Sequence, residues 1–468
     1  MGSLSYGIGF LFERSTFVLR LQEEVYRTYK KHIDIYPDEN RKGALAMKED
    51  LMHSPLFWNG TVDKTVQIPK IYDEESVAAF EKIAAMTHRI FSKVIREYLD
   101  HEDYRALFPF SKELEELILL PAPYQGLLPM ARFDLFYHED TGDFKFCEIN
   151  TDGTAAMLRD VELRRALINN PAHQAVIREY DLEYFELFDS WVETFMRLYN
   201  GYAKKVDHPN VAIIDILENA TLRDFEEFAR RFQAAGINCE ICDVRHLIYR
   251  DGHLYSSTGN RIDAIYRRAV TADLMDHFEE IGDFLAAVRE DAVFFAGAFA
   301  SQIIHTKWLF YVLHTERTRS FLTSEEWDFV KAHIPMTVDF GPEGIDLKTV
   351  QNNKDHYMIK PMDAYASKGI YAAGHECSEE DWKKITEEYY GKGLICQEYC
   401  HQYLTDNIDY AWGDGCWHPY INMPGLYVYD GRFAGFLMRM ACDEKIIVAH
   451  ENERTAPAFL VKGRRGSL

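Results

Sequence analysis

Arginine, aspartate, glutamate and asparagine side chains recur in two neighbouring segments, residues 129–137 and 145–154, with the spacings Arg-x-Asp and Glu-x-Asn-x-Asp. Both segments alternate apolar and polar residues, which is the period of a half-buried strand. Residues 138–143 between them are polar and contain a glycine. The two segments are therefore predicted to form an antiparallel hairpin.

Four polar residues of this hairpin could bind a divalent cation. Strand alternation places Arg132 and Asp134 on one face of the first strand. It likewise places Glu148 and Asn150 on one face of the second strand. If these faces coincide, two carboxylates and an amide oxygen converge beside a guanidinium, and such oxygen ligands suit Mg²⁺ shared with substrate phosphates. The alternative is a solvated sheet face, which is the usual meaning of such alternation.

The segment after the second strand, Asp152-Gly153-Thr154, leads into a helix predicted over residues 155–168. A glycine at the start of a helix exposes backbone N–H groups, which favour an anion such as a substrate carboxylate.

Lysines further along the chain indicate phosphate binding. A predicted strand delivers Lys360 to a loop of small residues that contains Ser367, Lys368 and Gly369. A fixed lysine and a closing loop are the groups that bind nucleotide phosphates, although no GxxxxGK[ST] motif occurs. Lys307 is one cation among bulky apolar residues. For the segment with Lys360 and Lys368, the alternative is an ordinary hairpin with two exposed lysines.

Two later strands each contain polar groups in apolar surroundings. Residues 393–400 include Gln397 and Glu398, which suits a hinge beside an adenine ring, although an edge strand would look similar. Arg439 is a charge in an otherwise apolar strand, and a buried arginine needs an anionic partner.

The elements around these motifs change in character along the chain. Residues 1–120 have helical periodicity, and a further helical run is predicted over residues 180–203. Residues 210–268 alternate strand, helix and strand, which predicts a small doubly wound α/β subdomain. Arg267 and Arg268 end its last strand, where open α/β sheets bind ligands. Both an anion-binding role and a surface salt-bridge role are open for them.

Length and composition limit the classes of protein. With 468 residues the chain exceeds one ordinary hydrophobic core. A net charge of −23 argues against nucleic acid or an anionic membrane as partner, although a local basic site could still bind ATP. The start of the chain lacks the basic region of a signal peptide. Eight scattered cysteines fit a reducing compartment, so a cytoplasmic location is expected.

The order of the motifs resembles the synthetase domain of glutathionylspermidine synthase. After the hairpin come a lysine, a Lys-Pro strand with its small-residue loop, Gln-Glu-Tyr, a late strand arginine, and Asn-x-Arg-x-x-Pro at residues 452–457. That family has an ATP-grasp fold of permuted order. The resemblance spans roughly residues 120–460, and the hairpin is its most specific part.

The resemblance implies a role for each candidate residue. Asp134, Glu148 and Asn150 would hold Mg²⁺, while Arg132 and Arg439 would steady the transferred phosphoryl group and the developing oxyanion. The other implied contacts are Lys307 and Lys360 with the ATP phosphates, Ser367, Lys368 and Gly369 in the lid, Gln397, Glu398 and Tyr399 at adenine, and Asp152, Gly153 and Thr154 beside a carboxylate substrate.

The expected fold class is α/β in the broad sense (α+β), ATP-grasp-like, with an N-terminal helical layer and a small doubly wound pre-ATP-grasp subdomain. The expected divisions are a helical layer (1–120), the metal hairpin with its following helices (121–205), the α/β subdomain (206–290), the nucleotide-binding portion (291–461) and a disordered tail (462–468).

The implied activity is an ATP- and Mg²⁺-dependent carboxylate–amine ligase that forms an amide through an acyl phosphate. Two departures from the family leave its substrates open: the lid is poorer in glycine, and Gly-Thr-Ala-Ala follows Asp152 in place of a hydroxyl-rich run. The alternatives are a phosphotransferase that stops at phosphorylation and a nucleotide-binding partner protein without turnover. The sequence does not indicate an oligomeric state.

Overall fold

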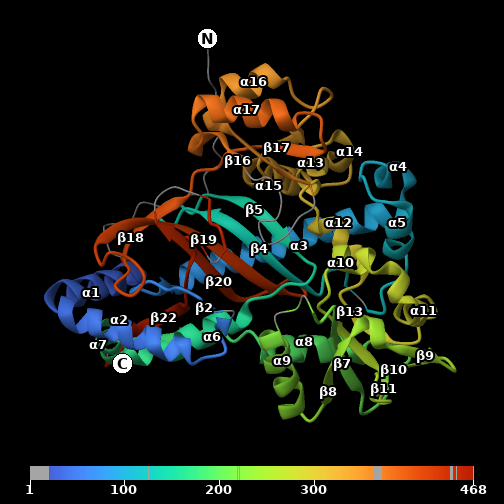
Figure 1. Cartoon of the computed structure of the whole chain (residues 1–468), viewed down its shortest axis with the longest axis horizontal. Coiled ribbons are helices and arrows are strands. Elements are labelled where there is room, and N and C mark those ends of the chain that lie inside the picture. The colour runs from blue at the N-terminus through green and yellow to red at the C-terminus, as the bar shows by residue number, and fades with distance from the viewer. Residues whose placement is uncertain are drawn as a thin grey trace.

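A sheet of six strands forms the centre of the molecule and contains the predicted hairpin (Figure 1). The computed structural model describes residues 20–466 except 59, 125, 219, 221, 363–371, 443–445 and 450. The strand order is β21-β20-β19-β4-β5, and β18 pairs with β19. These strands are β4 (Met130–Tyr137), β5 (Phe144–Asn150), β18 (Tyr403–Ile408), β19 (Trp417–Tyr429), β20 (Arg432–Cys442) and β21 (Arg454–Ala456). The antiparallel pairing of β4 with β5 confirms the hairpin.

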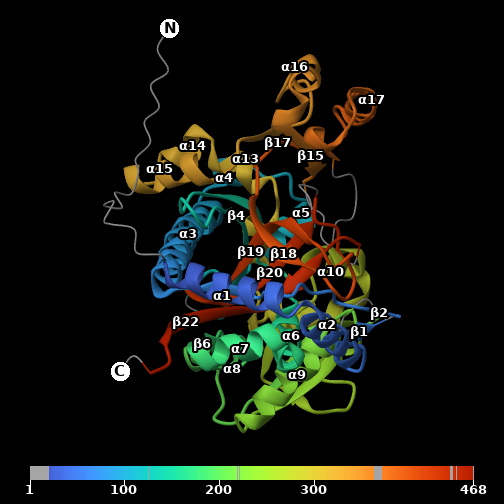
Figure 2. The ribbon, with the colours of Figure 1, turned by 90° about the vertical axis from the view of Figure 1, so that its left-hand side faces the viewer.

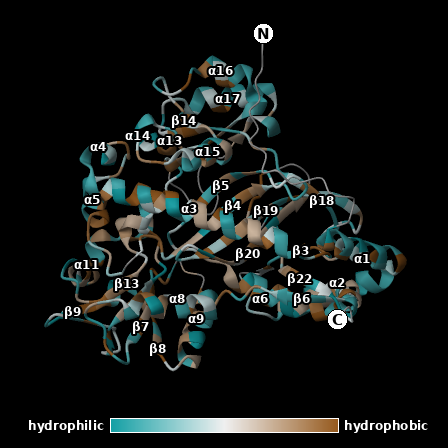
Figure 3. Ribbon diagram, turned by 180° about the vertical axis from the view of Figure 1, so that it is seen from behind, coloured by the Kyte–Doolittle hydropathy of each residue, from teal (hydrophilic) through white to brown (hydrophobic). Residues whose placement is uncertain are grey.

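Helix α3 (Glu74–Asp100) packs along the central sheet because its apolar residues recur every three or four positions. The ring of Phe80 meets Phe436 of β20 at 5.1 Å, and Phe91 meets Phe133 of β4 at 5.8 Å. Burying each such ring contributes about 1.5–3 kcal/mol. Figure 3 shows the apolar character of α3 where it crosses the strands. The short helices α4 (Glu102–Arg105) and α5 (Lys112–Ile118) follow it.

A parallel sheet forms the predicted α/β subdomain, with strand order β13-β12-β7-β8. Its strands are β7 (Asn210–Asp215), β8 (Asn238–Asp243), β12 (Ala264–Arg267) and β13 (Phe294–Ala296). Strand β13 lies beyond residue 290, so this sheet extends past the expected end of the subdomain. Helices α8 (Asp189–Asn200), α9 (Leu222–Ala234), α10 (Thr271–Asp276) and α11 (Gly282–Arg289) and a small sheet of β9 (Ile248–Arg250), β10 (His253–Tyr255) and β11 (Arg261–Ile262) complete it.

A small antiparallel sheet forms a separate lobe at the top of Figure 1. Its order is β14-β17-β15-β16, and its core contains Phe340, Ile359 and Trp382. The elements are β14 (Thr337–Asp339), β15 (Tyr357–Pro361), β16 (Ala372–Ala373), β17 (Leu394–Glu398), α16 (Leu347–Asn352) and α17 (Glu379–Tyr389). Helices α12 (Gln302–His305), α13 (Leu309–Leu313), α14 (Glu316–Arg319) and α15 (Ser324–His333) lead into this lobe.

Segments from both ends of the chain meet in a further region, seen in Figure 2. Helices α1 (Leu21–Ile35), α2 (Pro37–Met52) and α7 (Pro171–Glu179) pack together there, and α6 (Met157–Ala166) precedes α7. The hairpin β1 (Phe57–Trp58) and β2 (Thr61–Val62) follows α2. Strand β22 (Ala458–Arg464) lies between β3 (Lys70–Tyr72) and β6 (Tyr180–Tyr184).

Two predictions were wrong in this region. Residues 462–464, expected in a disordered tail, end β22, because buried Phe459 and Val461 anchor this strand and Arg464 pairs with Glu24 at 3.0 Å. The helical run predicted over residues 180–203 begins as β6, and its helix α8 starts only at Asp189.

None of the described helices combines the length and the apolar character that crossing a bilayer requires.

His173 lies in the apolar core of the region formed by the chain ends, where its Nδ1 is 2.6 Å from the hydroxyl of Tyr29. Burial lowers the pKa of His173 from its usual 6.5 to about 4. The unfolded chain therefore binds this proton more readily, and the stabilisation is lost as the pH falls from about 6.5 to about 4.

We expect His173→Gln, which keeps an acceptor for Tyr29, to reduce the loss of unfolding free energy between about pH 7 and pH 5. The reduction follows from the lowered pKa of His173 and amounts to about 2 kcal/mol. Urea unfolding at both pH values measures it. The control is His53→Gln, at a side chain that is 74% exposed; equal pH dependence in both variants would contradict a neutral, buried His173.

Candidate functional site

A β-bulge at Cys147 determines which residues of β5 face the site. The hairpin pairs Asp134 with Glu148 but Leu135 with Phe146, so Cys147 is an extra residue. Strict alternation would place Glu148 on the face of Phe146, which is fully buried. The bulge moves Glu148 to the face of Asp134. The common polar face predicted from the sequence therefore exists, but it depends on a bulge that the sequence pattern did not indicate.

Asp134 is fully buried, and both of its carboxylate oxygens accept hydrogen bonds. Its Oδ1 accepts from Nε of Arg132 at 2.8 Å. Its Oδ2 accepts from Nη2 of Arg132 at 3.1 Å, from Nδ2 of Asn150 at 3.0 Å, and from Nη2 of Arg439. Burial raises the pKa of Asp134, while the two arginines oppose that rise. Asp134 therefore connects three of the predicted site residues.

Glu148 is the more accessible carboxylate, with a side chain that is 26% exposed. Lys307 Nζ lies 3.7 Å from its Oε2, and Arg439 Nη2 lies 3.8 Å from its Oε1. Burial raises the pKa of Glu148, but the nearby cations, Lys307 foremost, outweigh burial and hold it well below its usual range. Glu148 is therefore an ionised group that faces outward from the hairpin.

Two lysines from separate segments reach this hairpin. Lys307 follows α12, and its backbone N–H donates to the carbonyl of Met362 at 2.8 Å. Lys360, on β15, is 3% exposed and donates from Nζ to the carbonyl of Cys147 at 3.2 Å. Burial lowers the pKa of Lys360. Segments far apart in the chain thus bring both predicted lysines to one place.

Positive charge exceeds negative charge in this cluster, although the whole chain has a net charge of −23. Four cationic side chains surround two carboxylates: Arg132, Arg439, Lys307 and Lys360 around Asp134 and Glu148. Buried or half-buried cations in excess favour an anionic ligand, because such a ligand offsets their mutual repulsion and desolvation.

The predicted hinge lies beside the hairpin, at the end of β17. The side chain of Gln397 is buried and donates to Oγ1 of Thr337 at 2.8 Å. Glu398 Oε2 lies 3.4 Å from Nζ of Lys145 on β5. The backbone N–H groups of Glu398 and Tyr399 both donate to carbonyls of neighbouring segments. The predicted lid residues Ser367, Lys368 and Gly369 lie outside the described residues.

Residues 152–154 pack against the end of the parallel sheet. Asp152 Oδ1 lies 2.7 Å from Nη2 of Arg267, and both side chains are 1% exposed. Asp152 Oδ2 accepts from the backbone N–H of Thr271. A β-carbon at Gly153 would lie 2.5 Å from Cγ1 of Val270. The Asp152–Arg267 ion pair was not foreseen, since only the fold brings these residues together.

Two comparisons with known sequences find nothing: no family model matches the chain, and no curated protein matches it. A solved structure does resemble it. A glutathione synthetase-like effector, GSS30, from Globodera pallida in its apo form matches with a TM-score of 0.58 and 12% sequence identity. The match covers 90% of this chain and 96% of that chain. The chain therefore shares its fold, of mixed α/β class, with that effector.

Gly425 on β19 provides the space that the Asp134 cluster occupies. A β-carbon there would lie 2.4 Å from Oδ1 of Asp134 and 3.0 Å from Cδ of Arg132. We expect Gly425→Ala to lower the unfolding free energy by about 1–3 kcal/mol, the usual cost of overpacking. Denaturant unfolding measures this. Gly463→Ala is the matched strand control, because a β-carbon there meets no atom within 4 Å; equal stability of the two variants would contradict the close packing.

Proposed function

We propose that the protein is an ATP- and Mg²⁺-dependent carboxylate–amine ligase with an ATP-grasp-type nucleotide site. One observation supports this most strongly: three distant segments bring two lysines and Arg439 to the hairpin, where Arg132, two carboxylates and an amide already lie. The fold, similar to that of a glutathione synthetase-like effector, agrees with such a site. The narrower assignment to the glutathionylspermidine synthase family rests on the sequence motifs alone.

The chemistry requires a cationic site. A carboxylate is a poor electrophile, so ATP first phosphorylates it to an acyl phosphate. An amine then attacks the acyl carbon, phosphate leaves, and the products are an amide, ADP and phosphate. Two anions must approach each other in the first step, and preorganised cations reduce the repulsion between them. The scheme requires no side-chain nucleophile.

The oxygen donors of the hairpin fit Mg²⁺, because two carboxylates and an amide on neighbouring strands are hard ligands. Glu148 and Asn150 would hold the ion. Asp134 would join them once one of the N–H groups that donate to its carboxylate turned to another acceptor. Bound Mg²⁺ would neutralise phosphate charge.

The cationic side chains have separate roles in this proposal. Lys307 and Lys360 bind the ATP phosphates from the side of the small lobe. Arg132 holds the Asp134 carboxylate with two hydrogen bonds. Nε of Arg439 is buried and has no acceptor among the described residues, so it is available to a phosphoryl oxygen.

A nucleotide-binding protein without turnover is the second candidate. The observation that favours it is the saturation of Asp134, whose two oxygens already accept from Arg132, Asn150 and Arg439. Turnover separates the two functions. A phosphotransferase would form ADP but no amide.

The test measures ADP release with Mg²⁺-ATP and a panel of carboxylic acids that includes glutathione and short peptides. Hydroxylamine is added to trap acyl phosphate as a hydroxamate. We expect one acid to give both ADP and hydroxamate, and replacement of hydroxylamine by polyamines or amino acids to identify the amine. ATP binding without ADP release for any acid would favour the protein without turnover.

Glu148→Gln is the matched inactive variant for this assay. It removes one ligand charge at a partly exposed side chain, whereas Asp134→Asn would leave buried Arg132 and half-buried Arg439 without their shared anion at a cost of about 3–5 kcal/mol. We expect Glu148→Gln to fold normally and to lose at least about 100-fold in ADP release. Glu325→Gln, at a side chain that is 72% exposed, should keep full activity.

Lys360→Met tests the ATP site by a binding measurement that does not depend on turnover. Because burial disfavours the charge of Lys360, we expect the variant to keep or raise the melting temperature. Loss of a phosphate contact should nevertheless weaken ATP binding about tenfold or more. Calorimetric titration with ATP and thermal unfolding measure the two effects. Lys331→Met, at a side chain that is 52% exposed, is the control; unchanged ATP affinity in Lys360→Met would remove this lysine from the site.

A further inference from the structure

The exposed apolar side chains of the protein gather around helix α2. Among the described residues, eleven large apolar side chains are exposed, and six of them lie within residues 35–58. A seventh, Ile168, is 70% exposed and belongs to the turn of residues 167–169, which packs against α2. Figure 2 shows α2 at the surface, with β1 and β2 beside it. A concentration of exposed apolar groups of this kind marks an interaction surface.

Helix α2 has one buried face and one exposed face. Its buried residues are Asn40, Gly43, Ala44, Met47 and Leu51. The opposite side of the helix carries a stripe of exposed residues at intervals of four and three positions: Asp38, Lys42, Leu45, Glu49 and Met52. Leu45 is 51% exposed and Met52 is 42% exposed. The stripe therefore points away from the body of the protein.

The two central charges of the stripe lack close partners within the chain. Lys42 forms no ion pair among the described residues. The side chain of Glu49 is 73% exposed, and its Oε1 lies 3.7 Å from Nδ1 of His53. Both charges are therefore available to a group outside the chain.

The order of these residues is complementary to itself. Lys42 lies three residues before Leu45, and Glu49 lies three residues after Ala46. Suppose that a second α2 runs antiparallel to the first, with a twofold axis between Leu45 and Ala46. Its Glu49 then lies opposite Lys42, and its Lys42 lies opposite Glu49. Each contact across a twofold axis occurs twice, so one pair of residues supplies two ion pairs.

The apolar residues at the two ends of α2 match in the same arrangement. Ile35 and Tyr36 come directly before the helix, and Phe57 and Trp58 form β1 shortly after it. All four are at least 38% exposed. Antiparallel helices bring the beginning of one to the end of the other. The apolar group before one α2 therefore comes close to the apolar group after the other.

These observations favour a second copy of the chain over an unrelated partner. An unrelated partner does not require a surface that is complementary to itself. Two chains with a net charge of −23 each also repel one another, so self-association needs opposite charges where the copies touch. Lys42 and Glu49 supply them.

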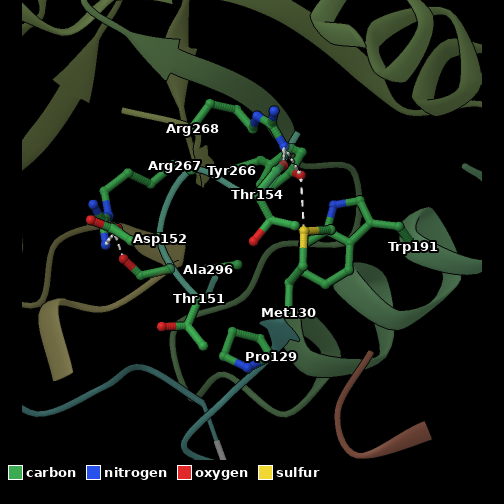
Figure 4. A pocket seen from close by; sticks show the side chains of 12 residues that line it. Pro129, Met130, Thr151, Asp152, Thr154, Trp191, Tyr266, Arg267, Arg268 and Ala296 are labelled. Carbon is green, nitrogen blue, oxygen red and sulfur yellow. Dashed lines mark hydrogen bonds and ion pairs between the residues drawn. The ribbon is translucent and has the colours of Figure 1, made fainter. Parts of the chain in front are cut away.

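The surface around α2 is separate from the interior where the two sheets meet. The cavity shown in Figure 4, beside Asp152 and Arg267, is lined by no residue of α2 or β1. The residues of the hairpin site also lie outside these two elements. A change in α2 therefore leaves both places intact.

We propose that the protein forms a twofold symmetric dimer in which two α2 helices pack antiparallel through their exposed stripes. Leu45 and Ala46 of both copies lie at the axis, and Lys42 of each copy pairs with Glu49 of the other. The apolar groups at the helix ends cover one another. The dimer requires neither ATP nor the proposed ligase function.

Sedimentation equilibrium of the full chain over a range of concentrations tests the dimer. We expect the wild type to reach twice the 54.5 kDa of one chain. Leu45→Glu places a carboxylate beside its own copy at the axis, so it should raise the Kd of the dimer about tenfold or more. This variant should fold normally, because Leu45 is half exposed in the single chain. The matched control is Ile248→Glu, at a side chain that is 44% exposed outside this surface; it should dimerise as the wild type does.

Charge reversal tests the pairing itself. Lys42→Glu alone and Glu49→Lys alone each place like charges opposite one another twice, so each should raise the Kd about tenfold or more. The double variant Lys42→Glu/Glu49→Lys restores opposite charges and should recover the wild-type Kd. A mixture of the two single variants should form a mixed dimer, because one chain then has two carboxylates at these positions and the other has two ammonium groups.

Far-UV circular dichroism checks that each variant is folded, so a change in mass reports on association. A wild type that stays monomeric at every concentration would overturn the dimer and leave the surface to a different partner. An equal Kd in the wild type, Leu45→Glu and Ile248→Glu would place the interface elsewhere and overturn the proposal. Single charge variants that dimerise as well as the wild type, or a double variant that does not recover, would overturn the antiparallel pairing.

Discussion

The site depends on one buried carboxylate that is shared by two arginines across three strands. Asp134 is on β4 and Arg439 is on β20, with β19 between them. The side chains meet only because β19 contributes Gly425 opposite Asp134, where a β-carbon would lie 2.4 Å from the carboxylate. A buried charge without a partner would be strongly destabilising. The packing of the central sheet therefore places both arginines around Asp134.

Local patterns in the sequence predicted the elements better than their partners. The hairpin, α9 and the strands of the α/β subdomain follow from periodicity, and the structure confirms them. The bulge at Cys147 was not predictable, because it is defined by the register of two strands and not by the pattern of either one. Strand β22 was missed for a similar reason: its partners, β3 and β6, are far away in the sequence.

The same distinction applies to the candidate site. Arg132, Asp134, Glu148 and Asn150 lie within 19 residues of one another in the sequence. Strand alternation grouped them two by two, whereas the face that all four share depends on the bulge at Cys147. That Lys307, Lys360 and Arg439 join them could be inferred only from the order of motifs in a family, because no local rule relates such distant positions. The partner of Asp152 was missed altogether. Arg267 had been noted at a strand end, but its buried ion pair requires the two sheets to be packed together.

The loop after β5 connects the hairpin site physically to the end of the parallel sheet. Asn150 donates to Asp134 at one end, and the carbonyls of Thr154 and Ala155 accept from Arg268 and Arg132 at the other. A displacement of this loop would change the hydrogen bonds of both arginines at once. Under the proposed ligase function, such a connection would hold the arginines on both sides of the loop in fixed positions. The loop is closely packed, with Gly153 against Val270 and Asp152 paired to Arg267, so its backbone has little room to move.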